Sequence, residues 1–239
     1  MLRSLKQEFF KFRYQRMPLY GLMTLLILMI YTYLTNHNAD FLLKSGFGAS
    51  QWVIIILITV ASSIISIEYQ NNTIINLLYK TSQKWQIYLA KFLVMLFYSL
   101  FLLLMNLIFT IILKFILFNN YHNAFLKPLL LNLTGGFIYS FFIIALAFLL
   151  ISWLKINPLV IGIGLVMGFL GASISTALYS IFNPIKWNPL NMIYVSNQLA
   201  NPHFIHSSHL NNSELIVATC LYAALFLIVG YQIFKKRSI

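Results

Sequence analysis

The sequence predicts an all-α polytopic membrane protein with six transmembrane helices, an interfacial amphipathic helix at the N-terminus, and both termini in the cytoplasm. Its 239 residues are 60% hydrophobic and only 8% charged, whereas about a quarter of the residues of a soluble domain are charged. Six apolar blocks are each long enough to cross a bilayer as a helix. A soluble all-α domain of this length would need far more polar side chains on its surface, so we set that class aside.

The basic residues predict the orientation of the chain. A net charge of +12 indicates loops that face anionic lipid, and we expect no nucleic acid partner. With the N-terminus inside, twelve of the 16 Lys and Arg residues fall in segments predicted inside. The positive-inside rule therefore places both termini in the cytoplasm. No small-residue cleavage site follows the first apolar block, so we expect that block to remain as a signal anchor.

Residues 1–17 predict a helix that lies in the membrane interface. Apolar side chains recur every three or four residues and form one stripe, made of Leu2, Leu5, Phe9 and Phe12. The basic remainder, made of Arg3, Lys6, Lys11, Arg13 and Arg16, suits contact with lipid phosphates. The alternative is a plain positive flank that only orients the first span.

The spans follow in order, with polar loops between them. We expect them at residues 18–34, 51–67, 92–118, 128–154, 159–182 and 214–234. A polar loop is expected at residues 35–50 and the longest outer loop at residues 183–213. The fifth span carries small residues at four-residue spacing, as close helix packing or a dimer contact requires: Gly164, Gly168, Gly171 and Ala172. Asn106 and Asn132 lie within spans, where an interhelical hydrogen bond is favoured over a ligand contact.

The residues offer little chemistry of their own. The four acidic side chains, Glu8, Asp40, Glu68 and Glu214, fall at or outside the span ends, so we expect no ion-coupled carrier. Neither a phosphate loop nor a hydrolase or metalloprotease motif is present in the sequence, so we expect no catalytic residues and no cofactor. His203, His206 and His209 are spaced to gather a metal, but ordinary surface residues are favoured and no metal site is expected. A chain of this kind needs a partner to do work.

Residues 68–91 form the one long polar interval predicted inside. Asn71 or Asn72 can cap a short helix whose apolar ridge is Ile74, Ile75, Leu77 and Leu78. Thr81 and Ser82 interrupt it and can cap a second helix that continues into the third span. A short helix held between two spans predicts a lever on which a soluble motor can push. The alternative is an interfacial loop that only anchors the hairpin.

This order of features resembles the type-2 (ABC-2) exporter permeases, which have a basic N-terminal helix, six spans and a long outer loop before the sixth. The motif positions here are Glu68, Thr73, Leu77, Leu78, Thr81, Ser82, Lys84 and Lys91. Asn72 stands where the family often has glycine, and the turn lacks the usual proline. The resemblance implies two permease chains, identical or homologous, and two ABC ATPase subunits. It also implies that ATP and Mg²⁺ bind the ATPases. The ATPases would contact a set of coupling residues made of Glu68, Thr73, Ile74, Ile75, Leu77, Leu78 and Lys84.

Within that family, the short chains resemble permeases that expel bacteriocins, lantibiotics or cytolytic peptides from Gram-positive bacteria. The resemblance thus implies a bacterial cell membrane location and an amphipathic peptide cargo. The outer loop would form short helices and contact cargo through Trp187, Ile193, Tyr194 and Phe204, although anchoring at the interface explains these residues equally well. Alternative functions are export of a lipid or small drug, an intramembrane enzyme, and a membrane adaptor without transport.

Overall fold

The structure is a computed structural model that describes residues 1–70, 84–121, 124–181 and 183–236. Every regular element in these ranges is a helix, so the expected all-α class is confirmed. A short helix, α1 (Leu2–Tyr14), precedes six helices that are long and apolar enough to cross a membrane. These six are α2 (Met17–Thr35), α4 (Ala49–Gln70), α6 (Lys84–Leu117), α7 (Leu126–Leu154), α8 (Asn157–Ile181) and α11 (Asn212–Lys236).

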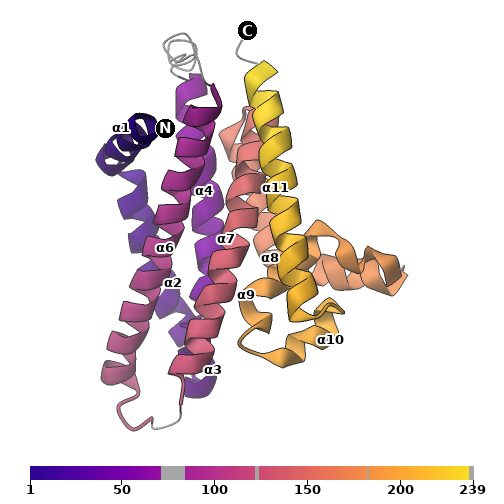
Figure 1. The fold of residues 1–239 in the computed structure, drawn as a ribbon. Helices are drawn as coiled ribbons and strands as arrows, with labels where there is room; N and C mark the ends of the chain where they lie inside the picture. Colours follow the sequence, from indigo (N-terminus) through magenta and orange to yellow (C-terminus); the bar gives the residue numbers. More distant parts are fainter. Residues whose placement is uncertain (71–83, 122–123, 182, 237–239) are drawn as a thin grey trace.

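Two helices form the centre of the bundle. In α4 and α7 the most apolar window is 72% and 61% buried, whereas no other span exceeds 28%. α7 contacts α11, α4, α6 and α8. It also contacts a short helix between α2 and α4 and another between α8 and α11. The remaining spans expose large apolar side chains such as Ile27, Phe115 and Leu221, as helices facing lipid do. Figure 1 shows α1 and the C-terminal end of α11 at the same end of the bundle.

α6 is much longer than the span it forms. Its 34 residues extend about 51 Å at 1.5 Å per residue, against a hydrocarbon layer of about 30 Å. Two contacts align it with the shorter α2: the Tyr98 hydroxyl donates to the carbonyl of Pro18 at 2.9 Å, and the ring of Phe118 lies 5.9 Å from that of Tyr33. The turns of α6 before Tyr98 therefore extend past the start of α2, on the side of the chain's N-terminus.

The segment expected as a polar loop at residues 35–50 contains a helix with one buried apolar side, so the prediction of a plain polar loop was wrong. Helix α3 (Ala39–Ser45) starts at Asn38, whose side chain accepts from the backbone of Phe41, and ends at Gly46, where φ is +61°. Both are ordinary helix-end signals. The apolar residues between and after them, Leu42, Leu43 and Phe47, are fully buried. The Asn106 amide donates to the Gly46 carbonyl at 3.0 Å, which fixes α3 to α6.

The loop before the last span is folded and packed into the bundle. It forms η1 (Asn183–Trp187), η2 (Pro189–Tyr194), α9 (Val195–Gln198), η3 (Pro202–Phe204) and α10 (Ile205–Ser208). α9 packs directly on α7, where a Cβ at Gly135 would overlap the carbonyl oxygen of Val195. The Asn132 amide donates to the Asn197 side chain at 2.8 Å across the same contact, and so makes an interhelical hydrogen bond.

Buried amides hold this loop together. The side-chain amide of Asn191 donates to the carbonyls of Lys186 (2.6 Å) and Ser208 (2.7 Å). The amide of Gln198 donates to the Leu210 carbonyl (2.8 Å), and its oxygen accepts from the Ser208 hydroxyl (2.7 Å). Both side chains are at most 2% exposed. Side-chain amides therefore donate hydrogen bonds to backbone carbonyls of the loop that have no partner in a regular helix. Buried polar groups need such partners.

Candidate functional site

Four charged side chains from three helices form a closed ring at the end of the bundle that carries α1. The Lys91 ammonium on α6 lies 2.7 Å from a carboxylate oxygen of Glu8 on α1 and 2.7 Å from one of Glu68 on α4. Lys11 on α1 closes the ring, at 2.9 Å from Glu8 and 3.6 Å from Glu68. Acidic and basic groups alternate around the ring, so every charge has opposite neighbours. We call these four residues the ion ring.

Local structure explains why the four side chains meet. Glu8 and Lys11 stand three residues apart on α1, and so share one helix face. Glu68 lies in the last turn of α4 and Lys91 in the second turn of α6, on either side of the segment that joins these helices. The last turns of α4 and the first turns of α6 extend beyond the level at which α2 begins. α1 packs against α6 in this extended part.

Aromatic contacts hold α1 along α6 beside the ion ring. The ring of Phe12 lies 5.2 Å from that of Tyr98, and the ring of Phe9 lies 5.8 Å from that of Phe97. Each is an edge-to-face pair, the arrangement that aromatic rings prefer. At the other end of α1, the amino terminus of Met1 donates to the Gln86 side chain at 3.2 Å. α1 is thus docked over its whole length and not only at its charges.

Burial makes the charge balance of the ion ring important. Lys91 is 2% exposed, and Glu8 and Glu68 are each 7% exposed. Burial alone would raise the pKa of Glu8, but Lys91 and Lys11 outweigh it and hold that pKa below its ordinary value. Burial would likewise lower the pKa of Lys11, but hydrogen bonding and attraction to Glu8 and Glu68 raise it. Both groups are therefore charged over the ordinary pH range.

One oxygen atom of the ion ring can still accept a hydrogen bond. The second carboxylate oxygen of Glu68 is buried and has no hydrogen-bond partner among the residues that the structure describes. A buried charge pair that loses one partner is strongly destabilised, whereas the complete set is near neutral in free energy. The arrangement therefore fastens α1 to α4 and α6, and the loss of one member alone would leave a buried charge uncompensated.

The expected coupling residues divide between two parts of the chain. Thr73, Ile74, Ile75, Leu77 and Leu78 lie outside the described residues. Lys84 is the first residue of α6 and is half-buried, and Glu68 is in the ion ring. Trp85 is 41% exposed, whereas Tyr88, one turn further along α6, is 1% exposed. Its ring packs against Phe148 and Phe234 at 5.4 Å each, so Tyr88 belongs to the core.

The N-terminal helix differs in detail from its expected pattern. Leu5 and Phe12 face the bundle, but Leu2 is 76% exposed and Phe9 is 43% exposed. Arg13 is exposed, and Arg16 follows the end of α1 because Gln15 adopts extended backbone angles. The helix therefore ends at Tyr14, and Arg16 precedes α2 as its N-cap.

The sequence analysis did not predict that the four residues of the ion ring contact one another. Glu8 follows Leu5 by three positions and precedes Phe12 by four, so it lies inside the apolar stripe that these residues define. A carboxylate on the buried face of an amphipathic helix requires a cationic partner. The position of Glu8 on the apolar face was therefore the sequence signal for a buried ion pair. The partner is Lys91, which the motif had marked only as the residue that opens the third span.

The small residues of α8 face helices of the same chain. A Cβ at Gly164 would overlap Ile58 of α4, and one at Gly168 would lie 3.2 Å from Ile55. At Gly171 the nearest atom would be in Ile193 of the outer loop, at 3.8 Å. Ala172 packs against the core. Their close contacts therefore lie within the chain.

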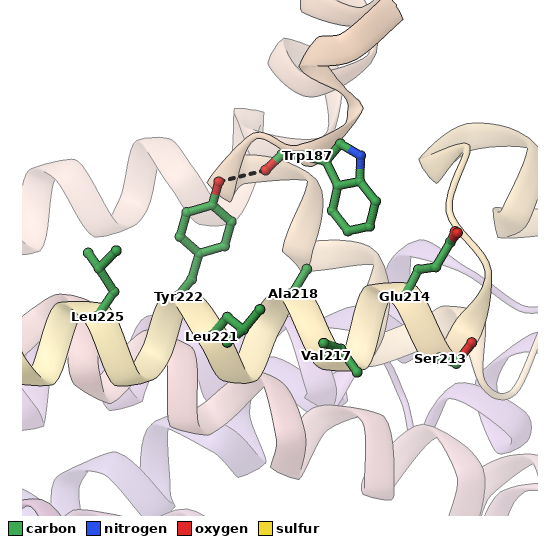
Figure 2. Close-up of a pocket in the computed structure, with 8 residues that line it drawn as sticks. All are labelled: Trp187, Ser213, Glu214, Val217, Ala218, Leu221, Tyr222 and Leu225. Atoms are coloured by element: carbon green, nitrogen blue, oxygen red, sulfur yellow. Dashed lines mark hydrogen bonds between the residues drawn. The ribbon is translucent and has the colours of Figure 1, made fainter.

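An apolar groove lies on the N-terminal half of α11, beside the folded loop (Figure 2). It has a volume of about 550 Å³, and Trp187, Val217, Leu221 and Leu225 line it. The Tyr222 hydroxyl donates to the Trp187 carbonyl at 2.7 Å and so holds η1 over α11.

The residues expected at a cargo surface do not share one environment. Trp187 lines the groove on α11 and is 42% exposed, whereas Tyr194 is only 8% exposed. The Tyr194 ring lies 6.1 Å from that of Phe204, and Ile193 packs against the core near Gly171. Among the described residues, no three His, Cys, Asp or Glu side chains are placed to hold a metal ion.

Six spans and an N-terminal helix fastened to two of them by buried charges define a multi-pass membrane protein of the permease class. The chain belongs to the ABC-2 family transporter proteins, whose family model matches residues 4–171. This family supplies the transmembrane component of ABC transporters, without an ATPase site of its own, and it implies an ABC ATPase partner. No curated protein matches the chain. The matched range contains the whole ion ring.

Proposed function

We propose that this chain is the membrane permease subunit of an ATP-driven exporter in the bacterial cell membrane. Two permease chains, identical or homologous, would work with two ABC ATPase subunits, which bind ATP and Mg²⁺. Membership of the ABC-2 family supports the permease role and the ATPase partner. The bias of the basic residues supports termini that face the cytoplasm, where an ATPase is reached.

The observation that carries the coupling proposal is the position of the ion ring. Glu68 and Lys91 flank the segment at residues 71–83, which joins α4 to α6. We assign the contact with the ATPase to this segment, through Thr73, Ile74, Ile75, Leu77 and Leu78, with Lys84 at its border. A push on it would reach α4 and α6 directly. Through Glu8 and Lys11 the same push would reach α1, so three helices would move together.

The proposed cargo is a hydrophobic or amphipathic peptide, as in bacteriocin self-immunity. The groove on α11 supports this proposal because it is lined by apolar side chains and has Glu214 at one end. Peptides with apolar and cationic faces suit such a lining. A lipid or small drug also suits an apolar groove, so competition among the three classes is part of the test.

The experiment uses the chain co-expressed with a candidate ABC ATPase partner and reconstituted in liposomes. ATP hydrolysis and uptake of a labelled amphipathic peptide into inside-out vesicles are measured together. We expect peptide to stimulate hydrolysis and to accumulate only with ATP. Glu8→Gln is expected to reduce transport, whereas Asp40→Asn, which removes a carboxylate from an exposed pair with Lys44, leaves it unchanged.

Two outcomes would reject the proposal at different levels. If no ATPase co-purifies with the intact chain, the role as a transport subunit fails and a membrane adaptor remains. If the ATPase binds but a lipid or small drug, and not the peptide, stimulates hydrolysis and is moved, only the cargo is wrong. Trp187→Ala in the groove then shows whether the substrate that is moved uses this surface.

A further inference from the structure

A second groove lies where α1 ends and α2 begins. Its volume is about 960 Å³, within the range of roughly 300–1,000 Å³ that ligand pockets span. Its walls come from α1, α2 and α6, and they are mostly apolar: Phe9, Leu19, Leu22, Phe97 and Phe101. Among the described residues that line it, the charged ones are Arg13 and Arg16, at the bend between α1 and α2.

No acidic side chain is left to neutralise these two arginines. The whole chain has four acidic residues. Two are in the ion ring, Asp40 pairs with Lys44, and Glu214 accepts from the backbone of Asn211. In the part of the chain that the structure describes, neither Arg13 nor Arg16 has a carboxylate within salt-bridge distance. Both side chains are exposed, so an anion that approaches them comes from outside the chain.

The depth of the groove matches a lipid headgroup above acyl chains. Pro18, whose carbonyl accepts from Tyr98, marks the level at which the candidate span α2 begins. Arg13 and Arg16 precede this level in the chain, whereas Leu22 and Phe101 lie about one turn further in, at 3.6 residues per turn. The positive end of the dipole of α2 lies beside the arginines, and it favours an anion.

We propose that this groove binds an anionic phospholipid of the membrane in which the chain lies. Arg13 and Arg16 hold the phosphate, for which the planar guanidinium group is suited. An acyl chain lies against Leu19 and Leu22 of α2 and Phe97 and Phe101 of α6. The lipid thereby packs across the junction at which α1 passes into α2. This site does not depend on the proposed transport function.

The test counts lipids bound to the full-length chain by native mass spectrometry in detergent. Phosphatidylglycerol, phosphatidylcholine and inorganic phosphate are titrated separately. We expect one phosphatidylglycerol to bind preferentially, with no displacement by phosphate. Arg13→Gln with Arg16→Gln is expected to weaken its binding about 30-fold, which corresponds to two basic residues at an anionic surface.

The matched control is Arg3→Gln with Lys6→Gln. It removes the same total charge, but from exposed positions on α1 that lie outside the groove. We expect less than about a threefold change, because the headgroup contact is local. Size-exclusion profiles and thermal unfolding check that both variants fold.

Four outcomes would overturn the proposal. Equal losses in both double variants indicate diffuse attraction and no site. Equal binding of phosphatidylcholine removes the role of the headgroup charge. Displacement by inorganic phosphate indicates a free-anion site, and loss of ATPase co-purification with unchanged lipid binding assigns the arginines to the ATPase surface.

Discussion

The ammonium of Lys91 lies 2.7 Å from a carboxylate oxygen of Glu8, although the two residues are 83 positions apart in the chain. Both are almost completely buried. This contact makes α1 part of the transmembrane structure, whereas the composition of the segment suggests only a helix resting on lipid. The stability of the whole bundle should therefore respond to single changes in the ion ring.

Lys91→Met is expected to lower the free energy of unfolding by about 3–5 kcal/mol. It leaves Glu8 and Glu68 buried with only Lys11 beside them, and an uncompensated buried charge costs about that much. Thermal or denaturant unfolding of the full chain in micelles measures the loss. Lys44→Met is the matched control, because it breaks an exposed pair that is worth about 1 kcal/mol or less.

Adding Glu68→Met to Lys91→Met should recover most of that stability. The double variant removes one charge of each sign, and it leaves the Glu8–Lys11 pair intact. Replacement of buried ion pairs by apolar residues of similar volume is often neutral or stabilising. A double variant no more stable than Lys91→Met would show that the lost stability comes from packing and not from charge.

The docking of α1 should be lost in acid and in strong base. The pKa of Glu8 is lower in the folded chain than its ordinary 4.5, so its stabilisation is present above that value and is lost as the pH falls through the folded pKa. The pKa of Lys11 is higher than its ordinary 10.5, so its contribution is lost as the pH rises through the folded pKa.

Spin labels at positions 10 and 100, in a Cys220→Ser background, report the distance between α1 and α6. The background is clean because the chain has one cysteine. We expect a constant distance from about pH 5 to about pH 10, with separation outside that window. Glu8→Gln should weaken docking and abolish the acid step. An acid step that persists in Glu8→Gln would assign the transition to another group.

Gly135→Ala should separate the loop that precedes α11 from α7. The added Cβ would overlap the carbonyl of Val195, and backbone cannot move aside as a side chain can. We expect a loss of about 1–3 kcal/mol in the free energy of unfolding, the usual cost of overpacking. Gly162→Ala provides the control, because nothing lies within 4 Å of its added Cβ. Equal effects of the two changes would contradict the close approach of α9 to α7.

Asn191→Ala should loosen the same loop by a different route. The carbonyls of Lys186 and Ser208 would both lose a donor in a buried site. We expect a cost of about 1–3 kcal/mol, and faster amide hydrogen exchange in η2 and α10. Asn201→Ala removes an exposed amide that caps η3, and it should cost less than about 1 kcal/mol. Unchanged exchange in Asn191→Ala would mean that the amide is not needed for the fold of the loop.

The six spans could be predicted because length and apolarity alone decide whether a helix crosses a membrane. Five of the six predicted starts lie within two residues of the observed ones. The exception is α6, which starts at Lys84, eight residues before the predicted span, although a helix continuing from Thr81 and Ser82 into that span was expected. Its first turns are too polar for a span but are still helical. Hydropathy measures contact with lipid, and it cannot locate the end of a helix that continues beyond the lipid.

The ion ring and α3 were harder to predict for a common reason. Each depends on contacts between parts of the chain that are distant in sequence. Leu42 and Phe47 are as apolar as span residues, but they are too few for a span and so fell within a predicted loop. In the sequence, Glu8 and Lys91 each lie in a polar segment that flanks a predicted span. Only the packing of α1 on α6 shows that they form a buried pair.

The way the ion ring divides between helices has a consequence for reversibility. α1 contributes one carboxylate and one ammonium, Glu8 and Lys11, while α4 and α6 together contribute one of each, Glu68 and Lys91. If α1 lifts away, the ring separates into two electrically neutral dipoles, and neither side is left with a net monopole in a poorly hydrated place. The attraction between two such neutral pairs decreases steeply with distance. α1 can therefore separate from α4 and α6 and dock again without protonation of a carboxylate.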